Sequence, residues 1–155
     1  MTEIEKITVH TESMVKGFFD EYRWLSNYHV SPVVYEGLEY GSSEAAYQSA
    51  KCDDSYVKSQ FQKLSPLQSK QYSKTIPLKK GWDSIKKGVM YQVLVSKFTL
   101  TPELGQKLIE TGDKYLEETN YWGDTFWGVC EGKGKNTLGE LLMQIRKELN
   151  DNKLI

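Results

Sequence analysis

The sequence predicts an α+β fold in which helices predominate over strands. Three observations predict it: helix-start signals and helical apolar spacing recur after residue 42, strand-like runs are short, and those runs cluster early and again at residues 115–129. The 155 residues contain no internal repeat, low-complexity tract or linker rich in proline, glycine and serine. We therefore expect a single domain over residues 1–155, large enough to bury its own core.

The first strands are expected near the start of the chain. Residues 4–9 and 15–19 have the composition of short strands. Residues 32–40 have the pattern of a hairpin that turns at Glu36-Gly37. These segments predict small sheets at the beginning of the chain.

The helices are placed by their caps and by their apolar spacing. Ser42 or Ser43 caps a helix whose first turn carries Glu44, which is favourable against the helix dipole. In a long helix after Gly81, the residues Ile85, Val89 and Val93 form a core stripe. The full set of expected helices after the first covers residues 54–63, 66–73, 82–97, a helix from Pro102 to a stop at Gly112, and a last helix after residue 136.

The last helix has the clearest start signal in the chain. Thr137-Leu138-Gly139-Glu140 matches a capping box. One face of this helix is expected to be buried, and it carries Leu138, Leu141, Leu142, Ile145 and Leu149.

Composition excludes several classes of protein. No apolar run approaches the roughly 20 residues that span a bilayer, and the N-terminus lacks the pattern of a signal peptide, so no membrane partner is expected. Cys52 and Cys130, the two cysteines, are expected to be free thiols in the cytoplasm. His10 and His29 with two scattered cysteines make a poor set of metal ligands, so neither a metal nor another cofactor is expected.

The charge is distributed unevenly along the chain. The net charge is −1, yet residues 51–97 hold ten lysines against three aspartates, a net charge of +7. Such a segment either steers phosphates or forms solvated helix faces, and the solvated faces are slightly favoured. Arg23 and Arg146 are the only arginines, which argues against a dedicated nucleic-acid groove.

A first candidate site lies in the glycine-rich segment before the last helix. Asp124 stands beside Phe126 and Trp127, and Gly128 allows a close approach of the backbone. Neither the P-loop spacing nor the dinucleotide fingerprint is matched nearby. Asn136 and the N–H groups that open the last helix could nevertheless hold an anion or a hydroxyl. The pattern suits a flat nucleotide-like ligand, and a buried aromatic hairpin fits it as well.

A second candidate site lies on the first predicted helix after the hairpin. Glu44, Gln48 and Lys51 fall at i, i+4 and i+7 and share one face. Alone, this stripe is more typical of a solvated face than of a binding wall, but the small alanines beside it favour an inner helix. A buried Glu44 would have a raised pKa and could act as a general acid. Trp82 is either a core anchor or a wall of the site, and Asn27 either holds a ligand or closes a turn.

The chain resembles the YbiA-like, or NADAR (NAD- and ADP-ribose-associated), family. The resemblance runs from about Phe18 to Leu149 and depends on the order and spacing of short motifs. These motifs are Leu25-Ser26-Asn27-Tyr28, Ser43-Glu44 with Tyr47-Gln48 and Lys51, Gly81-Trp82, Lys97-Phe98, Asp124-x-x-Trp127-Gly128 and Gly134-Lys135-Asn136-x-Leu138-Gly139.

The resemblance implies a mainly helical α+β domain that cleaves N-glycosidic bonds without a metal. Known activities of the family fall on ribosylamino-pyrimidine phosphates of riboflavin synthesis, and other members remove ADP-ribose from guanine. Two departures stand out: Ala45 replaces a frequent histidine after the glutamate, and Tyr28 replaces a usual phenylalanine. A mechanism that needs that imidazole is therefore not expected here.

These arguments converge on an N-glycosidase acting on a ribosyl-phosphate or ADP-ribosyl small molecule, or on ADP-ribosylated nucleic acid. Glu44 is expected to do acid–base work and Asp124 to position ribose or water in the same cleft. Lys51 either neutralises phosphate or forms a Schiff base at C1′. The expected substrate-binding residues are Asn27, Tyr47, Gln48, Trp82, Trp127, Gly128 and Asn136.

Two other classes of function stay open. A non-catalytic module that binds ADP-ribose or a nucleotide would use the same aromatic rings and lysines. It would have no need of a protonated glutamate. A nucleic-acid protein that uses the lysine-rich middle of the chain is a weaker option, and its affinity would fall steeply with salt.

Overall fold

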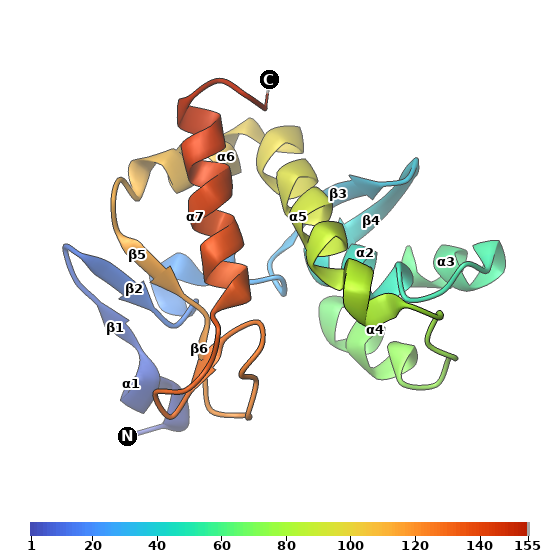
Figure 1. The fold of residues 1–155 in the computed structure, drawn as a ribbon, viewed down its shortest axis with the longest axis horizontal. Helices are drawn as coiled ribbons and strands as arrows, with labels where there is room; N and C mark the ends of the chain where they lie inside the picture. Colours follow the sequence, from blue (N-terminus) through green and yellow to red (C-terminus); the bar gives the residue numbers. More distant parts are fainter. Residues whose placement is uncertain (155) are drawn as a thin grey trace. The chain divides into compact units, whose positions relative to one another are not determined.

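The computed structural model describes residues 1–154, which fold into two compact units. The terminal unit contains the first 26 residues together with the chain from Gly105 onward. The central unit is Asn27–Leu104. Both units combine helices with short strands (Figure 1), which is the α+β arrangement that the sequence predicts.

The terminal unit is built around a three-stranded sheet in the order β1-β2-β5. The strands β1 (Val9–His10) and β2 (Met14–Lys16) are antiparallel, and β5 (Tyr115–Glu117) runs parallel to β2. A separate parallel pair joins β6 (Thr119–Asn120) to β7 (Val129–Cys130). Short strands near residues 115–129 are therefore confirmed.

The terminal unit also contains helices. They are α1 (Glu3–Ile7), the 3₁₀ helix η1 (Asp20–Leu25), α7 (Thr137–Asn150) and most of α6 (Pro102–Glu110), which begins in the central unit. The helix α7 packs against β5 (Figure 1). Its fully buried core residues include Leu142 and Ile145, as the apolar spacing predicts, whereas Leu149 is only half-buried.

The central unit begins with a hairpin of β3 (Val30–Tyr35) and β4 (Leu38–Ser42). Glu36 and Gly37 both have positive φ angles, of 49° and 81°, as a tight hairpin turn requires. Burial alternates along β3, so one face of the hairpin joins the core. The predicted hairpin and its turn are confirmed.

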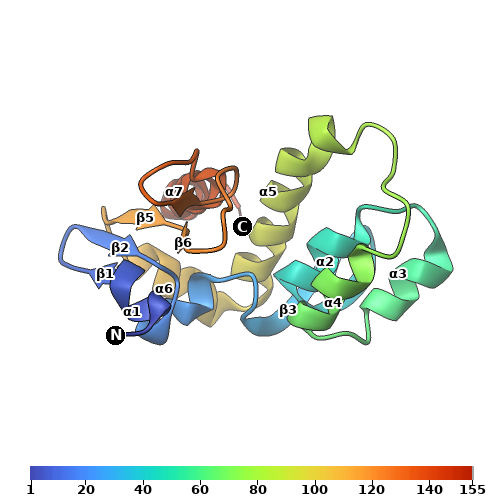
Figure 2. The same ribbon diagram turned by 90° about the horizontal axis from the view of Figure 1, so that it is seen from below.

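Four helices follow the hairpin. They are α2 (Ser43–Ser49), α3 (Ser55–Phe61), α4 (Pro66–Ser73) and α5 (Trp82–Leu100). Two views show α2 beside α4 (Figures 1 and 2), and α2 also packs against α5. The short helix α2 is thus an inner element of the central unit.

Three details of the sequence prediction are wrong. Residues 4–9 are not a strand: the Thr2 hydroxyl caps α1 by accepting a hydrogen bond from the Glu5 N–H, and β1 starts only at Val9. Ile85 is 41% exposed and is not part of the core stripe, although Trp82 before it and Val89 after it are buried. Asn136, with a φ of 52°, precedes the first residue of α7, and no side-chain hydrogen bond caps that helix.

No helix within residues 1–154 combines the length and the apolar character that crossing a bilayer requires.

Candidate active site

The helix α2 presents polar side chains inside the central unit. Its start is set by the Ser42 hydroxyl, which accepts a hydrogen bond from the Ala45 N–H at 3.1 Å. Every residue of α2 is buried, and Glu44 is only 8% exposed. The solvated-face interpretation of this helix is therefore wrong, because small neighbours allow other elements to cover it on all sides.

Glu44 and Gln48 interact along one face of α2. The amide nitrogen Nε2 of Gln48 donates a hydrogen bond of 3.4 Å to Oε2 of Glu44. The other amide atom, Oε1 of Gln48, is buried and accepts no hydrogen bond from the described part of the chain. Because a buried acceptor without a donor costs free energy, Gln48 is suited to receive a hydroxyl or N–H group of a ligand.

Lys51 stands two residues beyond α2, next to the ring of Tyr47. Its amine nitrogen Nζ lies 5.5 Å from the centroid of the Tyr47 ring, within the range of a cation–π contact. The Tyr47 ring in turn lies 5.3 Å from the Trp82 ring, at an interplanar angle of 57°. Tyr47 and Trp82 are both 5% exposed, so the amine is held over a rigid apolar wall.

The surroundings of Lys51 favour its neutral amine. Burial lowers the pKa of Lys51, and the charges of Lys70, Lys86 and Lys74 lower it further, while Glu44 acts in the opposite direction. A lysine with a depressed pKa is a better nucleophile near neutral pH, because more of it is unprotonated.

Asn27 and Tyr28 border the start of α2. The backbone carbonyl of Asn27 accepts a hydrogen bond from the Glu44 N–H at 3.2 Å, and its side-chain Oδ1 accepts one from the Ser43 hydroxyl at 2.8 Å. Burial and the nearby charge of Glu44 raise the pKa of Tyr28 to about 12, so its phenol stays protonated. Asn27 thereby closes the turn that brings Tyr28 near Glu44.

In the terminal unit, Asp124 organises the segment of residues 124–128, which we call the aromatic loop. Its carboxylate Oδ1 accepts hydrogen bonds from the N–H groups of Phe126 at 3.1 Å and Trp127 at 2.9 Å. The Asp124 side chain is half-buried. The rings of Phe126 and Trp127 meet edge to face with centroids 4.8 Å apart. Asp124 therefore sets the position of the rings beside it.

Gly128 is required by a close approach within the protein. A Cβ atom at this position would overlap the carbonyl oxygen of Glu118 and come within 2.8 Å of Nδ2 of Asn120. The absence of a side chain at Gly128 therefore allows the aromatic loop to lie directly against the segment that contains Glu118 and Asn120.

Asn136 and the start of α7 hold the same loop. Nδ2 of Asn136 donates to the Leu116 carbonyl at 2.9 Å, and its Oδ1 accepts from the Glu118 N–H at 2.9 Å. The N–H groups of residues 136–138 donate to the carbonyls of Gly128, Phe126 and Trp127. The prediction that these N–H groups are open to an anion is therefore wrong, because the loop carbonyls already accept them.

Each unit thus assembles part of the predicted set. The central unit brings together Asn27, Glu44, Tyr47, Gln48, Lys51 and Trp82, and the terminal unit brings together Asp124, Trp127, Gly128 and Asn136. Sequence reasoning missed Asn120, which is 1% exposed and whose Oδ1 accepts from the N–H groups of Trp122 and Asp124. It also missed the lysines around Lys51, although the positive charge of residues 51–97 was a visible signal.

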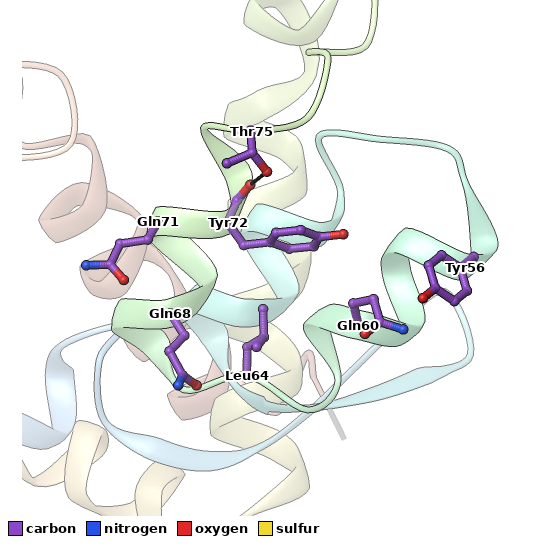
Figure 3. Close-up of a pocket in the computed structure, with 7 residues that line it drawn as sticks. All are labelled: Tyr56, Gln60, Leu64, Gln68, Gln71, Tyr72 and Thr75. Atoms are coloured by element: carbon purple, nitrogen blue, oxygen red, sulfur yellow. Dashed lines mark hydrogen bonds between the residues drawn. The ribbon is translucent and has the colours of Figure 1, made fainter.

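A separate pocket lies between α3 and α4 (Figure 3). Its volume is about 450 Å³, and the Tyr72 ring extends into it from α4 toward α3. Its lining residues are Tyr56, Gln60, Leu64, Gln68, Gln71, Tyr72 and Thr75. None of them carries a carboxylate or an amine, so acid–base chemistry is not assigned there. Within residues 1–154, no group of three or more His, Cys, Asp and Glu side chains is arranged to hold a metal ion.

The fold and the sequence of this chain are similar to those of proteins named N-glycosidase. The NADAR domain model matches residues 12–150, and the chain belongs to this family. The solution structure of the Escherichia coli protein YbiA superposes with a TM-score of 0.81 at 31% identity, covering 97% of this chain and 93% of that one. The α+β, YbiA-like fold that the resemblance implies is confirmed.

Relatives from other organisms are named for N-glycosidase activity or for riboflavin biosynthesis. N-glycosidase YbiA of Escherichia coli K12 is 34% identical over 135 residues, which are 84% of this chain and 83% of that protein. A protein of Vibrio vulnificus named for riboflavin biosynthesis is 29% identical over 86% of this chain and 37% of its own length. An N-glycosidase of Nostoc punctiforme is 36% identical over 50% of this chain and 49% of its own length.

Proposed function

We propose that this protein is an N-glycosidase that hydrolyses the bond between C1′ of a ribose and a nitrogen of a base or amine. The observation that carries the proposal is the buried face of α2. Glu44 and the Gln48 oxygen without a donor lie on it, and the half-buried Lys51, whose pKa is lowered, follows two residues beyond the helix. Perturbed ionisable groups beside an unsatisfied acceptor are typical of catalytic sites. Kinship with proteins named N-glycosidase supports the same activity.

The chemistry needs one proton donor and one stabiliser of positive charge. As the C1′–N bond breaks, positive charge develops on the ribose and negative charge on the leaving nitrogen. Glu44 in its acid form gives a proton to that nitrogen, and water then adds to C1′ and returns its proton to the Glu44 carboxylate. The products are the free base or amine and a ribose that carries a hydroxyl at C1′. The reaction then requires only side chains and water.

The aromatic and amide groups position the substrate. Tyr47 and Trp82 form a wall against which a planar base or the ribose packs, and Gln48 accepts a hydrogen bond from a ribose hydroxyl. Asn27 acts by holding the turn at the start of α2. The neutral Tyr28 phenol contributes a donor near Glu44.

Lys51 has two proposed roles that an experiment separates. Its neutral amine attacks C1′ of the ring-opened sugar and expels the base or amine, which leaves with a proton, and water then hydrolyses the resulting Schiff base; alternatively its ammonium form neutralises a phosphate. Borohydride reduction during turnover traps a covalent ribosyl adduct only on the first route. The adduct is expected to disappear in Lys51→Ala. An active wild-type enzyme that gives no adduct would favour the phosphate role.

For the terminal unit we propose that Asp124 orients a ribose or a water molecule and that Trp127 stacks on a planar base. Gly128 and Asn136 serve the site indirectly, because they fix the backbone that carries Trp127.

The candidate substrates are ribosylamino-pyrimidine phosphates of riboflavin synthesis and ADP-ribosylated guanine, either as a nucleotide or in a nucleic acid. The riboflavin-related name of a relative supports the first class. With Cys52 and Cys130 as free thiols, we propose that the protein acts in the cytoplasm.

Direct incubation tests the proposed activity. The protein is mixed with each substrate class, and liquid chromatography measures the released base and the ribose phosphate or ADP-ribose. Release that depends on Glu44 is expected from at least one class. Tight binding without any release would instead identify a non-catalytic ADP-ribose module and contradict the proposal.

A further inference from the structure

The pocket between α3 and α4 is formed by one face of each helix (Figure 3). Tyr56 and Gln60 are four residues apart on α3, so their side chains leave the same side of it. On α4 and just beyond its end, Gln68, Tyr72 and Thr75 follow at spacings of four and three residues, which keeps them on one helix face. Helical spacing in both elements therefore brings one set of polar and aromatic side chains to the pocket.

Capping contacts fix the two helices that carry these side chains. The Asp54 carboxylate accepts a hydrogen bond from the Val57 N–H at 2.9 Å at the start of α3. At the start of α4, Ser65 and Gln68 form a capping box. Oε1 of Gln68 accepts the Ser65 N–H at 3.0 Å, and within residues 1–154 its Nε2 donates no hydrogen bond. The lining of the pocket thus contains an amide donor whose position is already fixed.

The two tyrosine rings of the pocket differ in how firmly they are held. Tyr72 packs on the fully buried Phe61, with ring centroids 5.0 Å apart, and its ring extends from α4 toward α3 (Figure 3). Tyr56 is 70% exposed, and no other ring of residues 1–154 lies against it. An aromatic side chain gains free energy when its faces leave water. Tyr56 is therefore suited to cover a flat ligand that lies beside Tyr72.

The lining carries hydrogen-bonding groups but no formal charge at neutral pH. Three of its residues are the glutamines Gln60, Gln68 and Gln71, and each amide offers two N–H donors and one carbonyl acceptor. The other lining residues are two tyrosines, one leucine and one threonine. A charged ligand would lose hydration there without gaining an ion pair from the lining. The lining therefore favours an uncharged ligand.

Shape and hydrogen bonding narrow the class of ligand further. A planar ring stacks on the face of a tyrosine, whereas a puckered, saturated ring of the same polarity makes a poorer contact. A glutamine amide pairs with an edge that presents a donor beside an acceptor, as the edge of adenine does. The pocket volume of about 450 Å³ lies within the range of roughly 300–1,000 Å³ that is usual for small-molecule sites. Nucleobases and related heterocycles combine these properties.

We propose that the pocket between α3 and α4 binds an uncharged planar heterocycle, such as a free nucleobase, against Tyr56 and Tyr72 with its edge on the glutamine amides. This pocket is separate from the candidate active site, because no residue of α2 lines it. The buried residues of α4, Pro66 and Ser69, also lie outside the lining. Binding in the pocket does not require the N-glycosidase activity.

Titration of four related heterocycles, followed by NMR, tests the proposed pocket. Adenine and uracil are planar and uncharged, dihydrouracil keeps the polar edge of uracil on a puckered ring, and orotate adds a carboxylate to uracil. We expect adenine and uracil to shift the side-chain amide signals of Gln60, Gln68 and Gln71. Dissociation constants for dihydrouracil and orotate should be at least about threefold higher than that for uracil. Equal affinity for uracil and dihydrouracil, tighter binding of orotate, or unshifted glutamine signals would overturn the proposal.

Substitution of the exposed tyrosine locates the bound heterocycle. Tyr56→Ala removes one wall of the pocket and is expected to weaken adenine binding about tenfold, the usual effect of losing one base–aromatic stacking contact. Gln60→Leu keeps the bulk of the side chain, removes one amide and should weaken binding severalfold. Tyr121→Ala is the matched control, because it removes a tyrosine of the terminal unit that is 49% exposed. It should bind adenine like the wild type. Equal losses in Tyr56→Ala and Tyr121→Ala would overturn the proposal.

Turnover distinguishes the pocket from the candidate active site. Tyr56→Ala and Gln60→Leu are expected to release base from an N-glycoside at the wild-type rate, although both bind adenine more weakly. A fall in base release that parallels the loss of adenine binding would place adenine in the active site and overturn the separate pocket. Adenine binding that is lost in Tyr56→Ala, in a protein that hydrolyses no N-glycoside, would preserve the pocket and overturn the proposed function.

Discussion

The polar groups of the two units differ in what they bond to. In the terminal unit, Asn136, Asn120 and the Oδ1 atom of Asp124 are engaged by the protein's own backbone. In the central unit, Gln48 keeps a buried acceptor without a donor and Lys51 keeps a charge that its surroundings disfavour. Native proteins satisfy buried polar groups unless a ligand completes them. The comparison supports the proposal that α2 carries the chemistry, while Asn120 and Asn136 hold the backbone of the terminal unit.

Apart from substitution of Glu44 itself, the largest expected effect is the loss of activity in Lys51→Met. The variant keeps the length and packing of the side chain but removes the amine. On either proposed role of Lys51, we expect kcat/KM to fall at least 100-fold. Steady-state measurement of base release checks this. Activity within threefold of the wild type would remove Lys51 from the site.

The same variant is expected to be more stable than the wild type at neutral pH. Because the pKa of Lys51 is lower in the folded than in the unfolded protein, its charge destabilises the fold fully below the folded pKa. The penalty disappears as pH rises toward 10.5, the ordinary pKa of a lysine side chain. Chemical denaturation at several pH values should show the stability gain of Lys51→Met shrinking as pH increases. A gain that grows with pH would contradict the assigned environment.

Gly128→Ala tests rigidity in the terminal unit. The new Cβ would overlap the Glu118 carbonyl, so we expect a loss of about 3 kcal/mol in the free energy of unfolding. For a chain of this length, that loss lowers Tm by roughly 6–12 °C. Gly88→Ala on α5 is the control: no atom lies within 4 Å of its Cβ, and it should be neutral or stabilising by up to about 1 kcal/mol.

Two substitutions of Asp124 distinguish a structural role of this side chain from a catalytic one. Asp124→Asn keeps an oxygen acceptor for the Phe126 and Trp127 N–H groups, whereas Asp124→Ala removes it. We expect only Asp124→Ala to lose stability, by about 1–3 kcal/mol. Both variants should lose roughly tenfold or more in kcat if the charge acts on the substrate. Full activity in Asp124→Asn would confine Asp124 to its structural role.

The smallest effect is expected from Tyr28→Phe. The phenol has its pKa raised to about 12, so it is a neutral donor near Glu44 at any physiological pH. Removing one such donor should lower kcat by severalfold, because a single hydrogen bond of about 1 kcal/mol is lost. A rate equal to the wild type would assign Tyr28 to packing alone.

Local signals predicted the elements that depend on neighbouring residues. The Ser42 cap, the hairpin turn at Glu36-Gly37 and the start of α4 at Pro66 follow from short-range chemistry, and all were predicted. The start of α7 was not, since Asn136 adopts a left-handed conformation while its side chain bonds to β5. A long-range contact thus overrode the apparent capping box.

The same distinction applies to the site. The spacing of Glu44 and Gln48 predicted their shared face, because one helix positions both. The lysines near Lys51 come from α4 and α5, so only the tertiary packing of those helices on α2 brings them together. No periodicity in the sequence carries that information.

The central claim is that the buried Glu44 acts on the N-glycosidic bond, and Glu44→Gln tests it most directly. The substitution preserves shape and an acceptor for the Gln48 amide but removes the transferable proton. Measured together, binding of ADP-ribose or ribose 5-phosphate should stay within about threefold of the wild type, while base release falls by 10²–10⁴-fold, the usual range for a general acid. Base release at the wild-type rate in Glu44→Gln would contradict the account.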